Sequence, residues 1–175
     1  HFDETVNYST DVTGSFNIYN ITAAIAAAHI LTKKPLEQIC DVVENFAGVS
    51  GRMETISTKP FVVVDFAHTP DGMKEVLKSF PTKDIIVVFG AGGDRDKEKR
   101  AVMGRVAFHY AKKIFVTSDN PRFEDPDLII EDILSGIPKL DNVEIEVNRK
   151  LAIQKAIEIS NEDSVVLILG KGDEE

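Results

Sequence analysis

The spacing of hydrophobic residues changes near residue 50. Before it, apolar residues recur at helical spacing in two segments, residues 16–31 and 35–48. After it, helical segments alternate with short apolar runs, which cover residues 61–66, 85–89, 114–117, 143–147 and 165–169. Continuous runs are typical of strands buried on both faces, and their alternation with helices favours a parallel, doubly wound sheet. The pattern predicts an α/β fold preceded by a short helical region.

Two weaker patterns complete this prediction. Residues 1–12 alternate in polarity and suggest a short strand. Residues 51–54, Gly-Arg-Met-Glu, mark a boundary, and residues 53–57 are expected to form an edge strand just behind it. We therefore expect the chain to divide into residues 1–50 and residues 51–175.

Composition narrows the range of functions. The 175 residues carry 20 lysines and arginines against 29 acids, a net charge of −9, which argues against nucleic acid or a membrane surface as a partner. Cys40 is the single cysteine, so an internal disulfide is excluded and a reducing, cytoplasmic location is expected. Its apolar helical position favours a small core residue. The sequence has no apolar stretch long enough to span a membrane.

Polar and glycine-rich segments follow four of the predicted strands. They are residues 65–71, 90–97, 118–122 and 170–174. The carboxyl ends of parallel strands meet at one edge of a sheet, and ligands bind outside that edge. The sequence therefore predicts one pocket, which Arg95, Asp119, Asn120, Arg122 and Glu174 face, with Asp65 and His68 along its rim.

The segment Ser118-Asp119-Asn120-Pro121-Arg122 has the chemistry to hold a small zwitterion. An arginine can grip a carboxylate through two parallel hydrogen bonds, and an aspartate can accept an ammonium group. On these residues alone, an Asx-Pro turn beside a surface arginine is an equally good explanation. The charged residues 94–100, taken alone, are typical of a solvated loop. Four such segments on one sheet favour the pocket.

Two common nucleotide-binding motifs are missing. Arg95 occupies the third glycine position of a Gly-x-Gly-x-x-Gly pattern that starts at residue 90, and no Gly-x-x-x-x-Gly-Lys-Ser/Thr loop occurs. A carboxylate at a strand end, such as Asp65, can still hold ribose hydroxyls. Asn17 and Asn20 share a face at the start of the first predicted helix, and capping explains one asparagine better than two.

Together these segments resemble the Mur ligase family, in the branch that adds the third residue of the peptidoglycan stem peptide. The matching segments, in the family's order, are residues 16–20, 51–54, 65–71, 92–97, 119–122 and 170–172. The resemblance implies a C-terminal Rossmann-like domain over residues 51–175, with about six mostly parallel strands, one antiparallel edge strand and helices on both faces. Residues 1–50 would be a helical remnant of the central ATPase domain.

The resemblance also implies a reaction, the formation of an amide bond with ATP and Mg²⁺. This reaction belongs to peptidoglycan synthesis, on which cell shape and cell division depend. A carboxylate of the UDP-N-acetylmuramoyl-dipeptide becomes an acyl phosphate, and the amine of a diamino acid displaces phosphate. Matching the family's motifs residue by residue implies that the contacts with ATP are Asn17, Asn20, Arg52, Asp65 and His68. The amino-acid contacts would be Arg95, Asp119, Asn120, Pro121, Arg122, Gly170 and Glu174.

No catalytic or metal-binding residue is assigned in this stretch. The P-loop and the metal ligands are expected upstream, so a fragment with these residues should be inactive alone, and a monomer is expected. The amino acid is expected to be meso-diaminopimelate, because Arg122 suits a second carboxylate that lysine lacks. Asp173 stands where the family has histidine, which keeps the lysine-adding version open.

Two further alternatives remain open. One is a folylpolyglutamate synthase-like ligase, which would carry a different string in place of residues 119–122. The other is a non-catalytic nucleotide-binding α/β module. A P-loop sequence before residue 1 would separate the ligases from the module.

Overall fold

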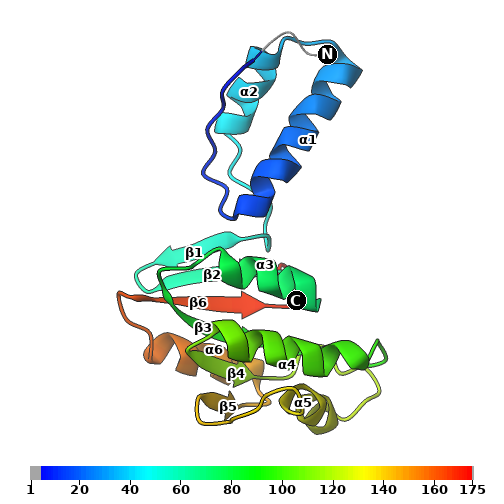
Figure 1. Cartoon of the computed structure of the whole chain (residues 1–175), viewed down its shortest axis with the longest axis vertical. Helices are drawn as coiled ribbons and strands as arrows, with labels where there is room; N and C mark the ends of the chain where they lie inside the picture. Colours follow the sequence, from blue (N-terminus) through cyan, green and yellow to red (C-terminus); the bar gives the residue numbers. More distant parts are fainter. Residues whose placement is uncertain (1–4, 175) are drawn as a thin grey trace. The chain divides into compact units, whose positions relative to one another are not determined.

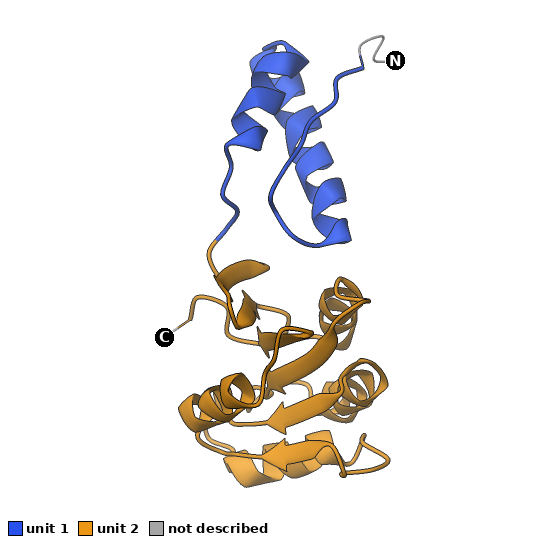
Figure 2. Ribbon diagram, turned by 90° about the vertical axis from the view of Figure 1, so that its left-hand side faces the viewer, with its two compact units in different colours: residues 1–49 blue, residues 50–175 orange. Residues whose placement is uncertain are grey.

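The computed structural model describes residues 5–174 of the chain. The chain divides into two compact units, residues 1–49 and residues 50–175 (Figure 2). Each unit has a buried apolar cluster of its own. The assignment of the first unit to the end of a larger ATPase domain stays a prediction.

The first unit contains two helices and the segment before them. Helix α1 spans Ser15–Thr32 and helix α2 spans Leu36–Glu44. Ile21 and Ile25 of α1 form a buried cluster with Cys40 of α2. The strand predicted near the start is wrong for residues 5–12, which form no strand, and residues 1–4 lie outside the described part. A strand needs a partner for its backbone groups, and the described residues of this unit contain none.

The second unit is built on one six-stranded sheet, with strand order β1-β2-β6-β3-β4-β5. β1 is antiparallel to β2, and the other neighbouring strands are parallel (Figure 1). This confirms the predicted mostly parallel sheet with one antiparallel edge strand. The elements in chain order are β1 (Glu54–Thr58), β2 (Phe61–Asp65), α3 (Pro70–Lys78), β3 (Asp84–Phe89), α4 (Glu98–Tyr110), β4 (Lys113–Val116), α5 (Pro126–Leu134), β5 (Val143–Ile145), α6 (Arg149–Glu158) and β6 (Ser164–Leu169).

Helices cover both faces of this sheet (Figure 1). On one face, α4 contacts α3 and α5, and on the other α6 packs against β3, β4 and β6. Right-handed crossovers explain the division, because only the connection through α6 runs back across the sheet. Val88, Phe115 and Val166 form a buried cluster with Ala152 and Ala156 of α6. Cover on both faces explains why the strand sequences are continuously apolar.

Three helices of this unit begin with a side-chain cap near the ends of the strands. Thr69 caps α3, Asp125 caps α5 and Asn148 caps α6, each through an oxygen that accepts a backbone N–H of the first turn. Proline follows the first two caps, as the sequence predicts for a helix start. The caps fix the path of the chain where it leaves β2, β4 and β5.

Candidate functional site

The carboxyl ends of β2, β3, β4 and β6 open into one pocket of about 400 Å³. The four polar segments therefore meet at one edge of the sheet, as parallel strands require. Of the residues expected to contact an amino acid, only Pro121 does not line this pocket, and the binding roles of the others stay predictions. The pocket is lined by Phe66, His68, Gly92, Arg95, Lys99, Asp119, Asn120, Arg122, Gly170 and Glu174.

Arg122 reaches this pocket from an unusual backbone position. Its φ is +52°, a left-handed conformation that is uncommon for residues other than glycine. Its Nη1 donates to the carbonyl oxygen of Gly93 at 2.7 Å and to that of Asn120 at 3.5 Å. A guanidinium has five N–H donors, so this anchoring leaves others for a ligand carboxylate.

The loops after β3 and β4 lie directly against each other. The N–H of Gly93 donates to the carbonyl oxygen of Asn120 at 2.9 Å. A Cβ on Gly93 would lie 1.9 Å from the carbonyl oxygen of Pro121, and one on Gly90 would lie 2.2 Å from that of Thr117. Only glycine permits such close backbone contact. Pro121 therefore contributes to the site through its backbone contact with the neighbouring loop.

An ion-pair network centred on the buried Arg100 lies behind these two loops. Arg100 is 0% exposed, and its guanidinium donates to both oxygens of Glu124, at 2.8 and 3.0 Å, to Asp132 at 2.8 Å and to the carbonyl oxygen of Gly92 at 3.1 Å. Lys97 forms a further ion pair with Glu124 at 3.0 Å. Hydrogen bonds from Arg100, then from Lys97 and a backbone N–H, lower the pKa of Glu124 to about 2. The network ties α4 and α5 to both loops of the pocket.

The interpretation of residues 94–100 as a solvated loop is wrong for Arg100. It holds for residues 94–97, which precede α4 and whose side chains are exposed. Arg100, however, lies three residues before Met103 and seven before Ala107, which are both buried on α4. Helical spacing thus places Arg100 on the inner stripe of the helix, and this is the signal that could have identified it. Glu124 has no comparable signal, because it lies in a loop.

Asp119 lies against the end of β6. Gly170 has a φ of +115°, and a Cβ at this position would lie 2.6 Å from Oδ2 of Asp119. The missing side chain therefore makes room for the carboxylate. A turn follows, in which the N–H of Glu174 donates to the carbonyl oxygen of Lys171 at 3.0 Å. The chain after β6 thus brings a second carboxylate to the pocket that Asp119 lines.

Arg52 and His68, the two side chains expected to contact the nucleotide phosphates or lie close to the nucleotide, both contact the ring of Phe66. The guanidinium of Arg52 lies 4.1 Å from the centre of the Phe66 ring, and the ring of His68 meets its edge at 4.7 Å between centres. Both side chains are exposed. An aromatic platform that holds an arginine beside a histidine fits the phosphates of a nucleotide. The supporting role of Phe66 is not apparent from sequence alone.

Asp65, expected to hold the ribose, is engaged mainly by the backbone. It is 7% exposed and does not line the pocket. Its Oδ2 accepts the N–H of Met53 at 2.8 Å and its Oδ1 accepts the N–H of Ala67 at 2.7 Å. Each carboxylate oxygen has a second lone pair, so Asp65 fits a ribose hydroxyl only through these remaining positions.

Asn17 and Asn20 lie in the first unit and bond to each other. Nδ2 of Asn20 donates to Oδ1 of Asn17 at 3.1 Å, and Nδ2 of Asn17 donates to the carbonyl oxygen of Thr13 at 2.7 Å. α1 begins after Gly14 without a side-chain cap, so neither asparagine has that role. Their contact with adenine stays a prediction.

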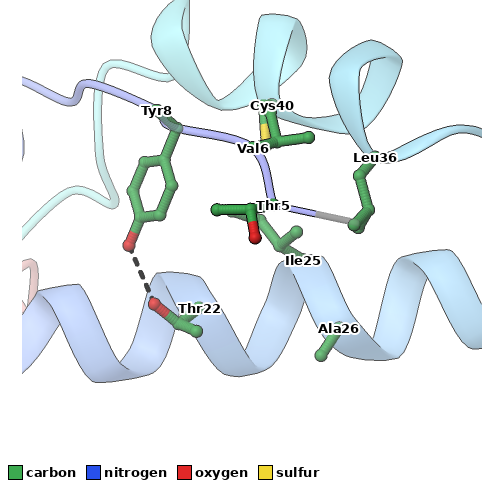
Figure 3. Close-up of a pocket in the computed structure, with 8 residues that line it drawn as sticks. All are labelled: Thr5, Val6, Tyr8, Thr22, Ile25, Ala26, Leu36 and Cys40. Atoms are coloured by element: carbon green, nitrogen blue, oxygen red, sulfur yellow. Dashed lines mark hydrogen bonds between the residues drawn. The ribbon is translucent and has the colours of Figure 1, made fainter. Parts of the chain in front are cut away.

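The first unit also has an apolar pocket of about 280 Å³ (Figure 3). Inside it, the hydroxyls of Tyr8 and Thr22 are hydrogen-bonded at 2.9 Å. Cys40 is buried, as expected, and burial together with neighbouring acids raises the pKa of its thiol, which disfavours a nucleophilic role. The lining is uncharged and offers nothing to hold a phosphate: Thr5, Val6, Tyr8, Thr22, Ile25, Ala26, Leu36 and Cys40.

Residues 5–174 contain no group of three or more histidine, cysteine, aspartate or glutamate side chains that is arranged to hold a metal ion. No helix in the same range is both long and apolar enough to cross a membrane.

A mostly parallel sheet whose strand ends present arginines and carboxylates to one pocket defines an α/β binding domain for a small charged molecule. A match to a known family identifies this domain more closely. Residues 51–172 match the model of the family described as "Mur ligase, glutamate ligase domain". The chain belongs to the Mur ligase family, which confirms the resemblance.

Relatives within the family include diaminopimelate ligases. The chain is 51% identical over 172 residues to the UDP-N-acetylmuramoyl-L-alanyl-D-glutamate–2,6-diaminopimelate ligase of Wolinella succinogenes, a match that covers 98% of this chain and 40% of the relative. A solved structure of a ligase with the same name has a TM-score of 0.69 at 36% identity, over 95% of this chain and 35% of the other. The chain therefore spans at most about 40% of the length of these two relatives.

A second kind of ligase shares the fold. The Mycobacterium tuberculosis folylpolyglutamate synthase complexed with ADP and AMPPCP has a TM-score of 0.75 at 19% identity, over 93% of this chain and 40% of the other. Identity this low shows a common fold alone.

Proposed function

We propose that this chain forms the amino-acid-binding part of a cytoplasmic, ATP-dependent ligase that adds meso-diaminopimelate to UDP-N-acetylmuramoyl-L-alanyl-D-glutamate. The observation that carries the proposal is the pocket in which Arg95, Lys99 and Arg122 lie together with Asp119 and Glu174. The names of the relatives support it. Such a ligase would act in peptidoglycan synthesis, and we expect it to be a monomer.

The charges of the pocket suit a molecule with a carboxylate and an amine at each end. Meso-diaminopimelate has this form, whereas lysine has an amine alone at its far end. Three cationic side chains against two acidic ones favour the ligand with the extra carboxylate. Arg122 would bind that carboxylate through paired hydrogen bonds, and Asp119 and Glu174 would accept ammonium groups.

The proposed reaction forms an amide through an acyl phosphate. ATP would supply the phosphoryl group that activates the glutamate carboxylate of the dipeptide. The free amine of the amino acid attacks the acyl carbon, the carbon–oxygen bond to phosphate breaks, and the amine loses a proton as phosphate leaves. The pocket residues would hold the amino acid at both ends, so that its amine approaches in one orientation, and such positioning accounts for much of the acceleration in two-substrate reactions.

The nucleotide contacts are assigned to a second group of residues. Arg52 and His68, which both contact Phe66, would bind phosphate oxygens. Asp65 would accept a ribose hydroxyl, and Asn17 and Asn20 would contact adenine. Mg²⁺ would be held by residues outside this chain, which is expected to be inactive alone.

A lysine-adding ligase is the second candidate, and Asp173 favours it. This residue is exposed and adds negative charge beside Glu174, which would attract the net positive charge of lysine. Asp173 does not line the pocket, however, whereas Arg122 does. We therefore prefer diaminopimelate.

The test is a panel of amino acids assayed with the complete ligase, with ATP and the UDP-N-acetylmuramoyl-dipeptide present. We expect phosphate release with meso-diaminopimelate and much less with L-lysine. Faster turnover with lysine would select the second candidate. Turnover only with glutamate and a folate acceptor would select a folylpolyglutamate synthase-like ligase, and no turnover at all would leave a non-catalytic module.

A further inference from the structure

Two buried side-chain nitrogens in the described residues have no hydrogen-bond partner, Nε of Arg100 and Nη1 of Arg149. Arg100 is otherwise satisfied by its network with Glu124 and Asp132. Arg149 differs, because no carboxylate among residues 5–174 lies within ion-pair distance of its guanidinium. Arg149 as a whole is partly buried, so its guanidinium has one buried nitrogen without a partner and no directly neutralising carboxylate.

Arg149 lies between the chain that leaves β5 and the end of β6. It is the first residue of α6, and its Nη2 donates to the carbonyl oxygen of Leu169 at 2.8 Å. Leu169 ends β6 and precedes Gly170, against which the carboxylate of Asp119 lies. Burial lowers the pKa of Arg149, and the negative charge of Asp119 acts in the opposite direction. Asp119 is thus the acid that interacts electrostatically with Arg149.

A partly buried cation with an unpaired buried nitrogen is unfavourable for folding. Arginine remains protonated when it is buried, and an unpaired buried donor is rare in native proteins. An apolar side chain of similar length would fill the same space without this disadvantage. A residue that works against local stability is expected where it serves a site, and the nearest site here is the pocket that Asp119 lines.

We propose that Arg149 is a positioning residue for the amino-acid pocket. It holds the end of β6 through Leu169 and supplies the positive charge that keeps the carboxylate of Asp119 in place at the pocket wall. Arg149 does not line the pocket itself, so it acts on the substrate through Asp119. The inference rests on the proposed function, because it takes Asp119 as the acceptor of a substrate ammonium group.

The test compares Arg149→Met, Arg149→Lys and the control Arg105→Met in the complete ligase. Methionine keeps the apolar stem, lysine keeps the charge, and Arg105 is an exposed residue of α4 outside the pocket. We expect Arg149→Met to raise the KM for the amino acid roughly ten- to hundredfold, with the KM for ATP and the thermal midpoint near wild type. Arg149→Lys should recover part of the loss, and Arg105→Met should change neither KM.

A KM for the amino acid in Arg149→Met equal to that of the control would overturn the inference. So would equal increases in both KM values together with a lower thermal midpoint, because these would indicate a purely structural role. If Arg149→Met does not fold, Arg149→Lys decides by the same criterion, a selective rise in the KM for the amino acid. Failure of the wild-type ligase to use any diamino acid would overturn the proposed function instead.

Discussion

Arg122 combines a left-handed backbone with a side chain fixed at one end by the carbonyl oxygen of Gly93. Such a backbone is unfavourable for a residue with a side chain, and it persists only where the surroundings impose it. Here the chain beside Arg122 is held by the hydrogen bond from Gly93 to the carbonyl oxygen of Asn120. A guanidinium held in this way has less freedom to lose when it binds a carboxylate, which favours binding.

The role of Asp65 can be tested through the ribose. We expect Asp65→Asn to reduce the preference of the complete ligase for ATP over 2′,3′-dideoxy-ATP, because a ribose hydroxyl would lose its acceptor. The variant should also be less stable, by about 1 to 3 kcal/mol, since asparagine can satisfy only one of the two backbone N–H groups that Asp65 accepts.

Nucleotide competition and thermal unfolding check the two effects separately. Asp71→Asn, an exposed residue in the first turn of α3, is the matched control and should change neither. An unchanged preference for ATP in Asp65→Asn, with the loss of stability alone, would show that Asp65 serves only the backbone.

Sequence could identify single residues where their type and position carry the chemistry. Arg95, Asp119 and Arg122 follow strand ends, and the structure brings all three to one pocket. Arg100 could be identified only through its helical spacing with Met103 and Ala107, because a charged residue in a polar stretch is usually solvated. Arg149 has no such signal, since its role depends on its contact with Leu169, which lies far away in the chain.

The loops after β3 and β4 act together with α4 and α5 through one ion-pair network. Arg100 of α4 bonds to Glu124, which follows the pocket loop, and to Asp132 of α5. Breaking such a network by removing one partner is more damaging than its net contribution suggests, because a buried charge is left behind. The loops of the pocket are therefore expected to depend on residues that never touch a ligand.

The network predicts a particular dependence of stability on pH. Glu124 titrates near 4.5 when unfolded and at about 2 when folded, so its charge stabilises the fold above pH 4.5 and the contribution is lost as the pH falls towards 2. We expect Glu124→Gln to be less stable than wild type above pH 4.5, and the difference to shrink steadily below it.

Urea unfolding of both proteins across this range measures the difference. Glu131→Gln, an exposed position on α5, is the control and should follow the wild type at every pH. A difference between Glu124→Gln and wild type that stays constant from neutral pH down to acid would contradict the account of the network.

Helices and strands were more predictable than their arrangement. The apolar runs located all five parallel strands. The position of β6 between β2 and β3 has no local signal, since the central strands are all continuously apolar. The expected strand near residue 8 failed for a related reason, because pairing depends on a partner that a local pattern cannot reveal.

For the chain as a whole, the comparisons and the site support each other. The match to the family covers residues 51–172, and this range includes every residue that lines the pocket except Glu174. The chain spans about 40% or less of its diaminopimelate-ligase relatives, so the activity is proposed for the complete ligase. The second unit supplies the pocket, and we expect the remaining parts to supply the P-loop and the metal ligands.

The central claim is that Arg122 binds the far carboxylate of the amino acid, and the most direct measurement is kcat/KM of Arg122→Ala in the complete ligase. The account predicts a loss of about 2 to 4 kcal/mol with meso-diaminopimelate, roughly thirty- to a thousandfold, because the carboxylate loses its partner. L-lysine, which lacks that carboxylate, should lose far less, and the KM for ATP should stay near wild type. Equal losses for the two amino acids, or an unchanged kcat/KM with meso-diaminopimelate, would contradict the account.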